Sequence, residues 1–177
     1  MAGEAGRLIA TATLVPLLLA AGPAVPGPVA ALAGRYSWHF RNGDVDGNAY
    51  WSDDVVEIVP VDATHAYIRS ELAFFNGHSC SLAGVGGAEG DAIVYHDATP
   101  GDEFGPRCVL TVRRKGAKLT LDDGDGGCKK YCGARGGYGD IDLPWASRRP
   151  ISYMARLKGS TQYRDAITEW KTGKPVE

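Results

Sequence analysis

Short segments in which apolar and polar residues alternate are the feature that most constrains the fold of this chain. Alternation with a period of two places one face of a strand on a core and the other in water. Pairs such as Asn42-Gly43 and Lys115-Gly116 separate the segments and favour turns. No pattern of helical period interrupts them before residue 150, which argues against a parallel sheet. The sequence therefore predicts an all-β fold, an antiparallel meander of seven or eight strands that closes into a small barrel or barrel-like sandwich.

The end of the chain has a different pattern. Apolar residues recur there at i, i+3, i+4 and i+7, on one face of a helix: Tyr163, Ala166, Ile167 and Trp170. Ser160 or Thr161 can cap the start of this C-terminal α-helix, and Gly173 can end it. We expect residues 150–177 to form a helical tail packed on the barrel, where the helix covers a barrel mouth or a sheet edge.

The first 33 residues resemble a secretory signal peptide. Arg7 precedes an apolar run, and Ala31-Leu32-Ala33 is a small-x-small cleavage sequence. Ala24 is an alternative last residue of the leader. Prolines interrupt the apolar run, so we expect no membrane span after cleavage. Cleavage after Ala33 leaves 144 of the 177 residues, with the β-barrel domain at 34–149.

Four cysteines lie beyond the leader: Cys80, Cys108, Cys128 and Cys132. An even number of cysteines in an exported chain indicates a disulfide framework. Cys80 and Cys108 begin strands that run the same way, so all four thiols are expected near one end of the sheet. A zinc site or a redox couple fits the spacing less well. We favour the pairing Cys80–Cys108 with Cys128–Cys132, because a glycine-rich loop can close a short ring, and the crossed pairings stay open.

The charge is divided between the two halves of the exported chain. Residues 35–106 carry three Lys and Arg against twelve Asp and Glu, a net charge of −9, whereas residues 107–177 carry fifteen against eight, a net charge of +7. The simplest interpretation is a solvated surface with internal pairing, and the alternative is an acidic face and a basic face that steer a charged partner. The basic clusters are short and lack interleaved aromatic residues, so nucleic acid is not expected as a partner.

An acidic loop at residues 42–53 resembles a calcium-binding EF-hand loop in its spacing. Its oxygen-bearing residues are Asn42, Asp44, Asp46, Asn48 and Asp53. The flanking segments are predicted strands rather than helices, and Asp and Asn also dominate ordinary turns. We therefore expect no metal and no cofactor, with calcium at these five residues as the weaker alternative.

No catalytic motif is present in the sequence. The four histidines show no metal-binding spacing, and no nucleophile motif occurs. We predict that the protein is not an enzyme. A cleft that brings His96 together with Asp97 or Asp102 is the arrangement that would favour an enzyme.

A glycine-rich segment at residues 128–139, "CKKYCGARGGYG", follows the alternating pattern at residues 118–122. It lacks the lysine and the following helix of a phosphate-binding loop. The simplest interpretation is a tight entry into the last strand. The alternative is a rigid loop that presents Arg135 and Tyr138 to a protein partner, since rigid loops lose little entropy on binding.

The order of these features resembles a loose class of small secreted or periplasmic disulfide-linked β-proteins, some of them similar to bacterial lysozyme inhibitors, with a calycin-like barrel. The resemblance covers about residues 36–145 and includes Cys-x-Leu strands at 80–82 and 108–110. It implies a monomeric periplasmic or secreted protein that binds a protein partner, most concretely a lysozyme-type hydrolase. A small-ligand carrier that uses the barrel mouth near Trp38, Phe40 and Phe74 is the second hypothesis.

Overall fold

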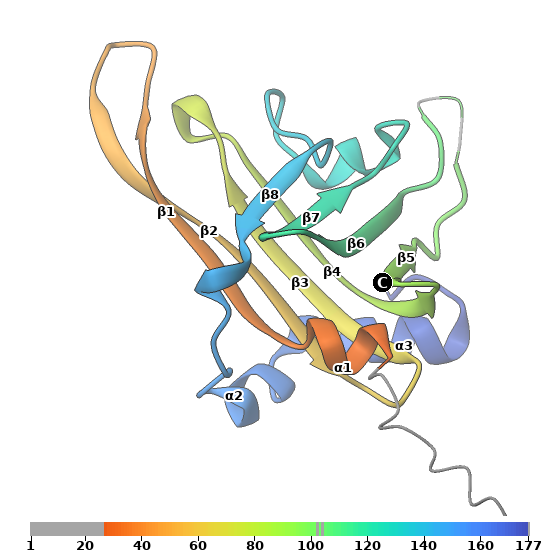
Figure 1. Ribbon diagram of the computed structural model, residues 1–177. Helices are drawn as coiled ribbons and strands as arrows, with labels where there is room; N and C mark the ends of the chain where they lie inside the picture. Colours follow the sequence, from red (N-terminus) through yellow and green to blue (C-terminus); the bar gives the residue numbers. More distant parts are fainter. Residues whose placement is uncertain (1–26, 102, 104, 177) are drawn as a thin grey trace, which may run out of the picture.

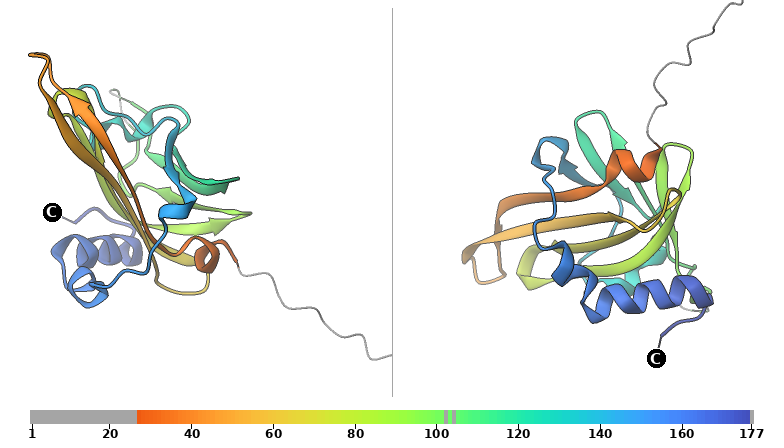
Figure 2. Two further views of the ribbon diagram at one scale, coloured as in Figure 1. Left: turned by 60° about the vertical axis from the view of Figure 1, so that its left-hand side comes forward. Right: turned by 90° about the horizontal axis from the view of Figure 1, so that it is seen from below.

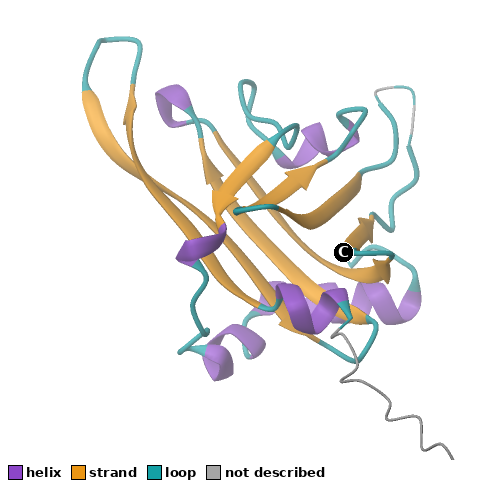
Figure 3. Cartoon of the chain, in the orientation of Figure 1, coloured by secondary structure: helices purple, strands orange, loops and turns teal. Residues whose placement is uncertain are grey.

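The computed structural model describes residues 27–101, 103 and 105–176 and has the all-β architecture that the sequence predicts (Figures 1 and 3). Eight antiparallel strands form one sheet in the order of the sequence. The strands are β1 (Gly34–Gly43), β2 (Ala49–Pro60), β3 (His65–Ala73), β4 (Ser79–Glu89), β5 (Ala92–His96), β6 (Val109–Lys115), β7 (Lys118–Asp122) and β8 (Ile141–Pro144). Short 3-10 turns connect or follow some of them, namely η1 (Phe75–Gly77), η2 (Gly127–Tyr131) and η3 (Trp145–Ser147).

The sheet curls into a barrel that is nearly closed between β1 and β8. Arg35 and Arg149, which follows β8 and η3, exchange two backbone hydrogen bonds of 2.9 and 2.8 Å. The backbone N–H of Ser37 donates to the Ser147 hydroxyl at 3.1 Å. Beyond these contacts the two edge strands are not paired with each other among the described residues. We call this line between β1 and β8 the seam.

Side chains fill the barrel interior. Every second residue of each strand points inward, as in β2, where Val56 and Ile58 are fully buried. The largest interior side chains with no exposed surface include Tyr36, Ile68, Leu82, Ile93, Leu110, Leu119, Leu121, Tyr138 and Leu143. A filled interior leaves no room for a large central ligand cavity of the kind that larger barrels enclose.

A short helix, α1 (Pro28–Leu32), closes the lower end of the barrel (Figure 2). Val29 and Leu32 are 2 % exposed and belong to the interior core, and α1 contacts β2, β4, β5 and β6. The Tyr36 hydroxyl donates to the carbonyl oxygen of Leu32 at 2.9 Å. Residues 28–33, which belong to the predicted leader, therefore pack as part of the barrel. Residues 1–26 lie outside the described residues, and their removal as a signal peptide stays a prediction.

The C-terminal helix predicted from the sequence is present as α3 (Thr161–Thr172), preceded by α2 (Met154–Lys158). Ser160 caps α3 through its hydroxyl, and Gly173 ends it with a positive φ of 64°. The helix does not cover a barrel mouth, however. It lies on the outer face of β3 and β4, as seen from below in Figure 2. The rings of Tyr163 and Tyr67 pack there with their centroids 4.7 Å apart. The side chains between α3 and the sheet form a second apolar cluster. This cluster explains why neighbouring residues of β3 are buried on both faces of the strand.

Candidate functional site

Both disulfides lie at the upper end of the barrel, opposite α1, as expected for cysteines at the starts of two strands of the same direction. The favoured pairing is wrong, because the bonds join Cys80 to Cys132 and Cys108 to Cys128. Cys80 and Cys132 face each other as an isolated β-bridge, which fixes their pairing by backbone geometry. All four cysteines are bonded, and such a framework is typical of proteins that fold outside the cytoplasm.

The loop at residues 133–138 is anchored beside the start of β4. The backbone N–H of Gly133, which follows Cys132, donates at 2.8 Å to the carbonyl of Ser79, which precedes Cys80. Gly136 lies against the same disulfide, where a Cβ atom would be 2.8 Å from the Cys80 sulfur. Only glycine allows so close an approach, so the loop is tied to the sheet at two points.

A lysine ammonium holds the interior of this loop. Lys129 Nζ donates to the carbonyl oxygens of Ala134, at 3.1 Å, and of Gly136. Arg135, between these two residues, is exposed. The loop is thus a braced turn with an arginine at its outer surface, and the presentation of Arg135 to a partner stays a prediction.

Tyr138 does not share that position. Its side chain has no exposed surface and belongs to the barrel core, where its hydroxyl lies 2.8 Å from the Ser70 hydroxyl. Burial raises the pKa of Tyr138 above its ordinary value, although the bond to Ser70 opposes this shift. The prediction that Tyr138 contacts a partner is therefore wrong, because the ring anchors the loop from inside the barrel.

Tyr138→Phe is expected to lower the free energy of unfolding by about 1 to 2 kcal/mol, because the buried Ser70 hydroxyl loses its partner. Urea denaturation followed by tryptophan fluorescence measures the change. Ser81→Ala, at an exposed position of β4, is the control and should change the free energy by less than about 0.5 kcal/mol. A Tyr138→Phe protein as stable as the parent would contradict the buried position of this hydroxyl.

The acidic loop forms the turn of the long β1–β2 hairpin. One Asp44 oxygen accepts hydrogen bonds from the backbone N–H groups of Asp46, at 3.0 Å, and Asn48, at 2.9 Å. The side chain of Asn48 donates to its other oxygen, and this bond is the main cause of a lowered Asp44 pKa. These contacts are those of an ordinary Asx turn.

The five residues of the calcium alternative do not converge. Asn42 donates from its side chain to Ser52 and to the Phe74 carbonyl, and Asp53 lies along β2 opposite His39, 2.9 Å from its Nδ1. In the described part of the chain no group of three or more His, Cys, Asp or Glu side chains could hold a metal ion. Turn contacts account for the positions of Asp44 and Asn48, and calcium at residues 42–53 stays the weaker alternative.

Exposed apolar side chains are concentrated at this hairpin, which projects beyond the rest of the barrel (Figure 1). The large apolar residues that are most exposed in the described chain are Trp38, Val45, Trp51, Phe75 and Val176. All but Val176 lie on the hairpin or on η1. Val45 and η1 are joined by a hydrogen bond from the Val45 N–H to the Asn76 side chain, and Gly77 donates to the hydroxyl of Tyr50. We call the outer group formed by Val45, Trp51 and Phe75 the hairpin surface.

Trp38 points to the other side of the hairpin, into a hollow of about 500 Å³ at the seam between β1 and β8. Apolar side chains of β8 form much of the opposite wall, with residues from the β6–β7 turn; the lining comprises Trp38, Asp54, Ala117, Lys118, Asp140, Ile141, Asp142, Leu143 and Pro144. Asp140, at the entry to β8, has a positive φ of 57°, a strained conformation for a residue with a side chain. The second hypothesis placed a site near Trp38, Phe40 and Phe74, and of these three residues Trp38 lines the hollow.

Asp54 is the unexpected member of this lining. It is 7 % exposed, and one of its oxygens accepts from the Ala73 N–H at 2.8 Å. Burial, together with the negative charge of Asp53, raises the pKa of Asp54 despite that hydrogen bond. The sequence held a signal for it, because Asp54 has the same parity along β2 as the buried Val56 and Ile58. A carboxylate at an inward-facing strand position is unusual and marks a site.

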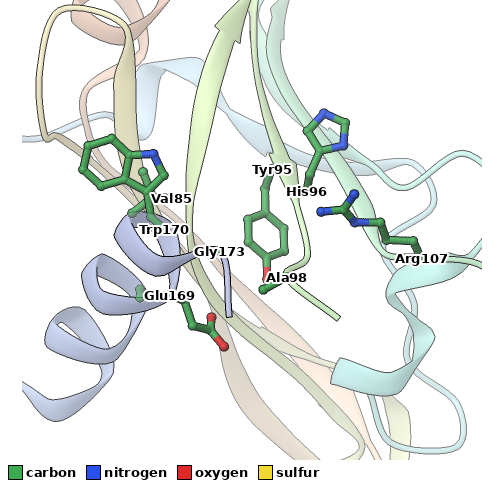
Figure 4. A pocket seen from close by; sticks show the side chains of 9 residues that line it. Val85, Tyr95, His96, Ala98, Arg107, Glu169, Trp170 and Gly173 are labelled. Carbon is green, nitrogen blue, oxygen red and sulfur yellow. The ribbon is translucent and has the colours of Figure 1, made fainter. Parts of the chain in front are cut away.

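A smaller pocket of about 160 Å³ separates α3 from β5 (Figure 4). Tyr95 lies between Glu169 and Trp170 of α3 on one side and His96 and Arg107 on the other. His96 Nε2 lies 3.2 Å from a carboxylate oxygen of Glu89, and Glu89 does not line the pocket. Burial raises the pKa of Tyr95 to about 12, so its hydroxyl stays protonated near neutral pH.

Asp97, next to His96, is engaged in structural bonds instead. It accepts from the Tyr131 hydroxyl and pairs with Lys130 at 2.8 Å, and Arg107 donates to its backbone oxygen. Burial acts to raise the pKa of Asp97, but the bonds from Lys130 and Tyr131 outweigh it and the pKa is lowered. Asp102 lies outside the described residues. The arrangement at Asp97 braces the disulfide end and includes no nucleophile and base in contact.

The fold and these sites define a nearly closed antiparallel barrel of eight strands, stapled at one end by two disulfides and carrying an exposed aromatic hairpin. No helix in the described ranges has both the length and the apolar character needed to cross a membrane. The chain matches no known family, no curated protein and no solved structure.

Proposed function

We propose that this protein is a non-enzymatic, exported binding protein that docks on a protein partner with the disulfide end of its barrel. The observation that carries the proposal is the hairpin surface. Trp51 is 65 % exposed, Val45 63 % and Phe75 45 %. Large apolar side chains exposed on one hairpin and on the turn beside it mark interaction sites, and tryptophan contributes strongly to binding energy at such sites.

Arg135 adds a specific polar contact at the same end. Its loop joins the η1 region, because Gly133 packs on His78 and Gly136 on the ring of Phe74. A braced loop loses little conformational entropy on binding, and an arginine can form paired hydrogen bonds with a carboxylate. The docking end therefore combines an apolar patch with one fixed cation.

A lysozyme-type hydrolase is the concrete partner that we propose. Such enzymes carry carboxylates in their clefts, where Arg135 would bind, and they are basic overall. The acidic half of the sequence forms β1–β5, which are consecutive neighbours in the sheet and include the hairpin. A negatively charged wall would speed association with a basic enzyme, most strongly at low salt. The proposed location is the periplasm or the extracellular space, and the protein acts as a monomer.

Arg135→Ala is expected to weaken binding to the susceptible lysozyme at least tenfold, because a charge-assisted pair contributes about 1.5 to 3 kcal/mol. Titration calorimetry with c-type, g-type and i-type lysozymes, together with cell-wall lysis assays, measures the effect. Arg156→Ala makes the same change of charge on α2, at the other end of the barrel, and should leave the affinity unchanged.

Trp51→Ala separates the general proposal from the concrete one. If lysozyme binds the parent and neither Arg135→Ala nor Trp51→Ala weakens this binding, the proposed docking surface is wrong. If no lysozyme binds but another envelope protein binds the parent and not the Trp51→Ala variant, the hydrolase is the wrong partner and the proposed binding function stands. If no protein is retained at all, the proposed function is wrong.

A further inference from the structure

The seam between β1 and β8 presents an open strand edge beside the hollow. In an antiparallel strand the N–H and C=O of one residue point to the same side, and successive residues alternate. Arg35 uses both groups toward Arg149, away from β2, and Ser37 donates to Ser147 on the same side. The β1–β2 register is continuous, so the backbone groups of His39 and Arg41 also face away from β2.

These backbone groups face no paired strand in the described structure. β8 pairs with β7 as far as Pro144, the last residue of β8. From Trp38 onward, β1 pairs with β2 alone. An open edge of this kind accepts an added strand, which supplies the missing backbone hydrogen bonds. Every second side chain of such a strand points to the barrel interior, into the space beside Trp38.

The chemistry of the hollow selects the side chain that would enter it. Its lining carries three carboxylates, Asp54, Asp140 and Asp142, against one ammonium, Lys118. Lys118 is occupied by Asp142 at 2.6 Å, and Thr120 donates to the same carboxylate. The unneutralised charge of the hollow is therefore negative and resides on Asp54 and Asp140.

Asp54 is the carboxylate of the hollow that an incoming cation would meet. It is more than nine-tenths buried, it lines the hollow, and its only partner among the described residues is the Ala73 N–H. A buried carboxylate without a cation is unfavourable, and an opposite charge brought beside it removes that cost. Asp54 lies opposite Trp38 in the β1–β2 register, and both residues line the hollow, so a cation that binds Asp54 lies close to an aromatic side chain.

We infer that the seam binds an extended basic segment of a polypeptide partner, which pairs with the free edge of β1 and inserts one lysine or arginine side chain between Trp38 and Asp54. The apolar stem of that side chain contacts Ile141 and Pro144, and its charged end meets Asp54. A short extended peptide thereby completes the barrel at the seam. The site is separate from the hairpin surface and from Arg135, so it stands or falls independently of the proposed function.

The test uses synthetic peptides with the full chain. The probe is an acetylated, amidated heptapeptide of alternating threonine and valine with one central lysine. The comparison peptides replace the lysine with norleucine, which keeps the stem and removes the charge, or carry N-methyl groups on alternate backbone nitrogens, which block one edge. Butylamine supplies the cation without a backbone. Affinity is measured by Trp fluorescence titration, and the location by amide shifts of His39 and Arg41 in NMR spectra.

We expect the lysine peptide to bind at least tenfold more tightly than the norleucine peptide, and we expect Asp54→Asn to abolish that difference. Asparagine keeps an acceptor for the Ala73 N–H, and thermal unfolding confirms that the variant is folded. Asp91→Asn, an exposed change of equal charge at the β4–β5 turn, should bind as the parent does. N-methylation of the edge that faces β1 should abolish binding.

Three results would overturn the inference. Equal binding of the lysine and norleucine peptides, or an unchanged preference in Asp54→Asn, shows that the hollow does not select a cation. Butylamine that binds as tightly as the peptide shows that no strand is added. Absence of binding of the lysine peptide at millimolar concentration shows that the edge is not a docking site. If Asp54→Asn fails to fold, Trp38→Leu at the half-exposed wall of the hollow replaces it, with the same expected loss of preference.

Discussion

A chain that begins at Gly34 is expected to be less stable than one that begins at Val25 by about 3 to 5 kcal/mol. The longer chain keeps α1, whose Val29 and Leu32 side chains fill the lower end of the core. Loss of one buried leucine alone costs about 2 to 5 kcal/mol, because a cavity or exposed core surface remains. The shorter chain also leaves the buried Tyr36 hydroxyl without its acceptor, the Leu32 carbonyl.

Urea denaturation of the two chains measures this difference. Leu32→Ala in the longer chain should produce most of the loss, whereas Ala31→Ser, at an exposed position of the same helix, should have little effect. Equal stability of the two chains would show that the interior does not need α1. The expected result favours the alternative cleavage after Ala24 over cleavage after Ala33, and the N-terminal sequence of the exported protein identifies the bond that is cut.

Loss of the Cys80–Cys132 disulfide is expected to lower the free energy of unfolding by about 4 kcal/mol. The bond joins residues separated by 52 positions, and closing so long a loop removes much entropy from the unfolded chain. The Cys108–Cys128 bond spans 20 positions, so its loss is expected to cost less, about 3 kcal/mol. The long-range bond should therefore be the more stabilising of the two.

The double substitutions Cys80→Ser/Cys132→Ser and Cys108→Ser/Cys128→Ser test this order by denaturant unfolding under identical conditions. The first pair should also release the Arg135 loop, because Gly133 and Gly136 both rest beside that disulfide. Limited proteolysis after Arg135 measures the release, and the second pair of substitutions is its matched control. A larger loss of stability in the second pair would contradict the loop-closure argument.

The alternation of side chains was sufficient to predict the sheet. Inward-facing residues such as Tyr36, Ile68 and Leu110 all lie on the apolar stripe of their strands. Lys115-Gly116 lies at a turn as expected, whereas Asn42-Gly43 forms the paired end of β1 and the turn follows it at residues 44–47. The caps of α3 at Ser160 and Gly173 were also predictable, because capping is a local interaction. Local patterns suffice where the physical cause is local.

The pairing of the cysteines was not predictable in the same way. Cys128 and Cys132 lie four positions apart, but η2 directs one toward β6 and the other toward β4. Sequence distance favoured a short ring, whereas the backbone bridge between Cys80 and Cys132 set the actual partners. Disulfide connectivity depends on which segments the barrel brings together, and four cysteines leave three possibilities open.

The same distinction applies to the sites. By itself the sequence determined the class of fold and the disulfide framework as a whole, because both follow from composition and local spacing. Only the tertiary structure decided that Tyr138 is buried, that residues 28–33 belong to the core and that Asp54 lines a hollow at an open edge. These features arise where distant segments meet as the sheet curls, and the spacing of residues along a chain carries no direct record of that closure.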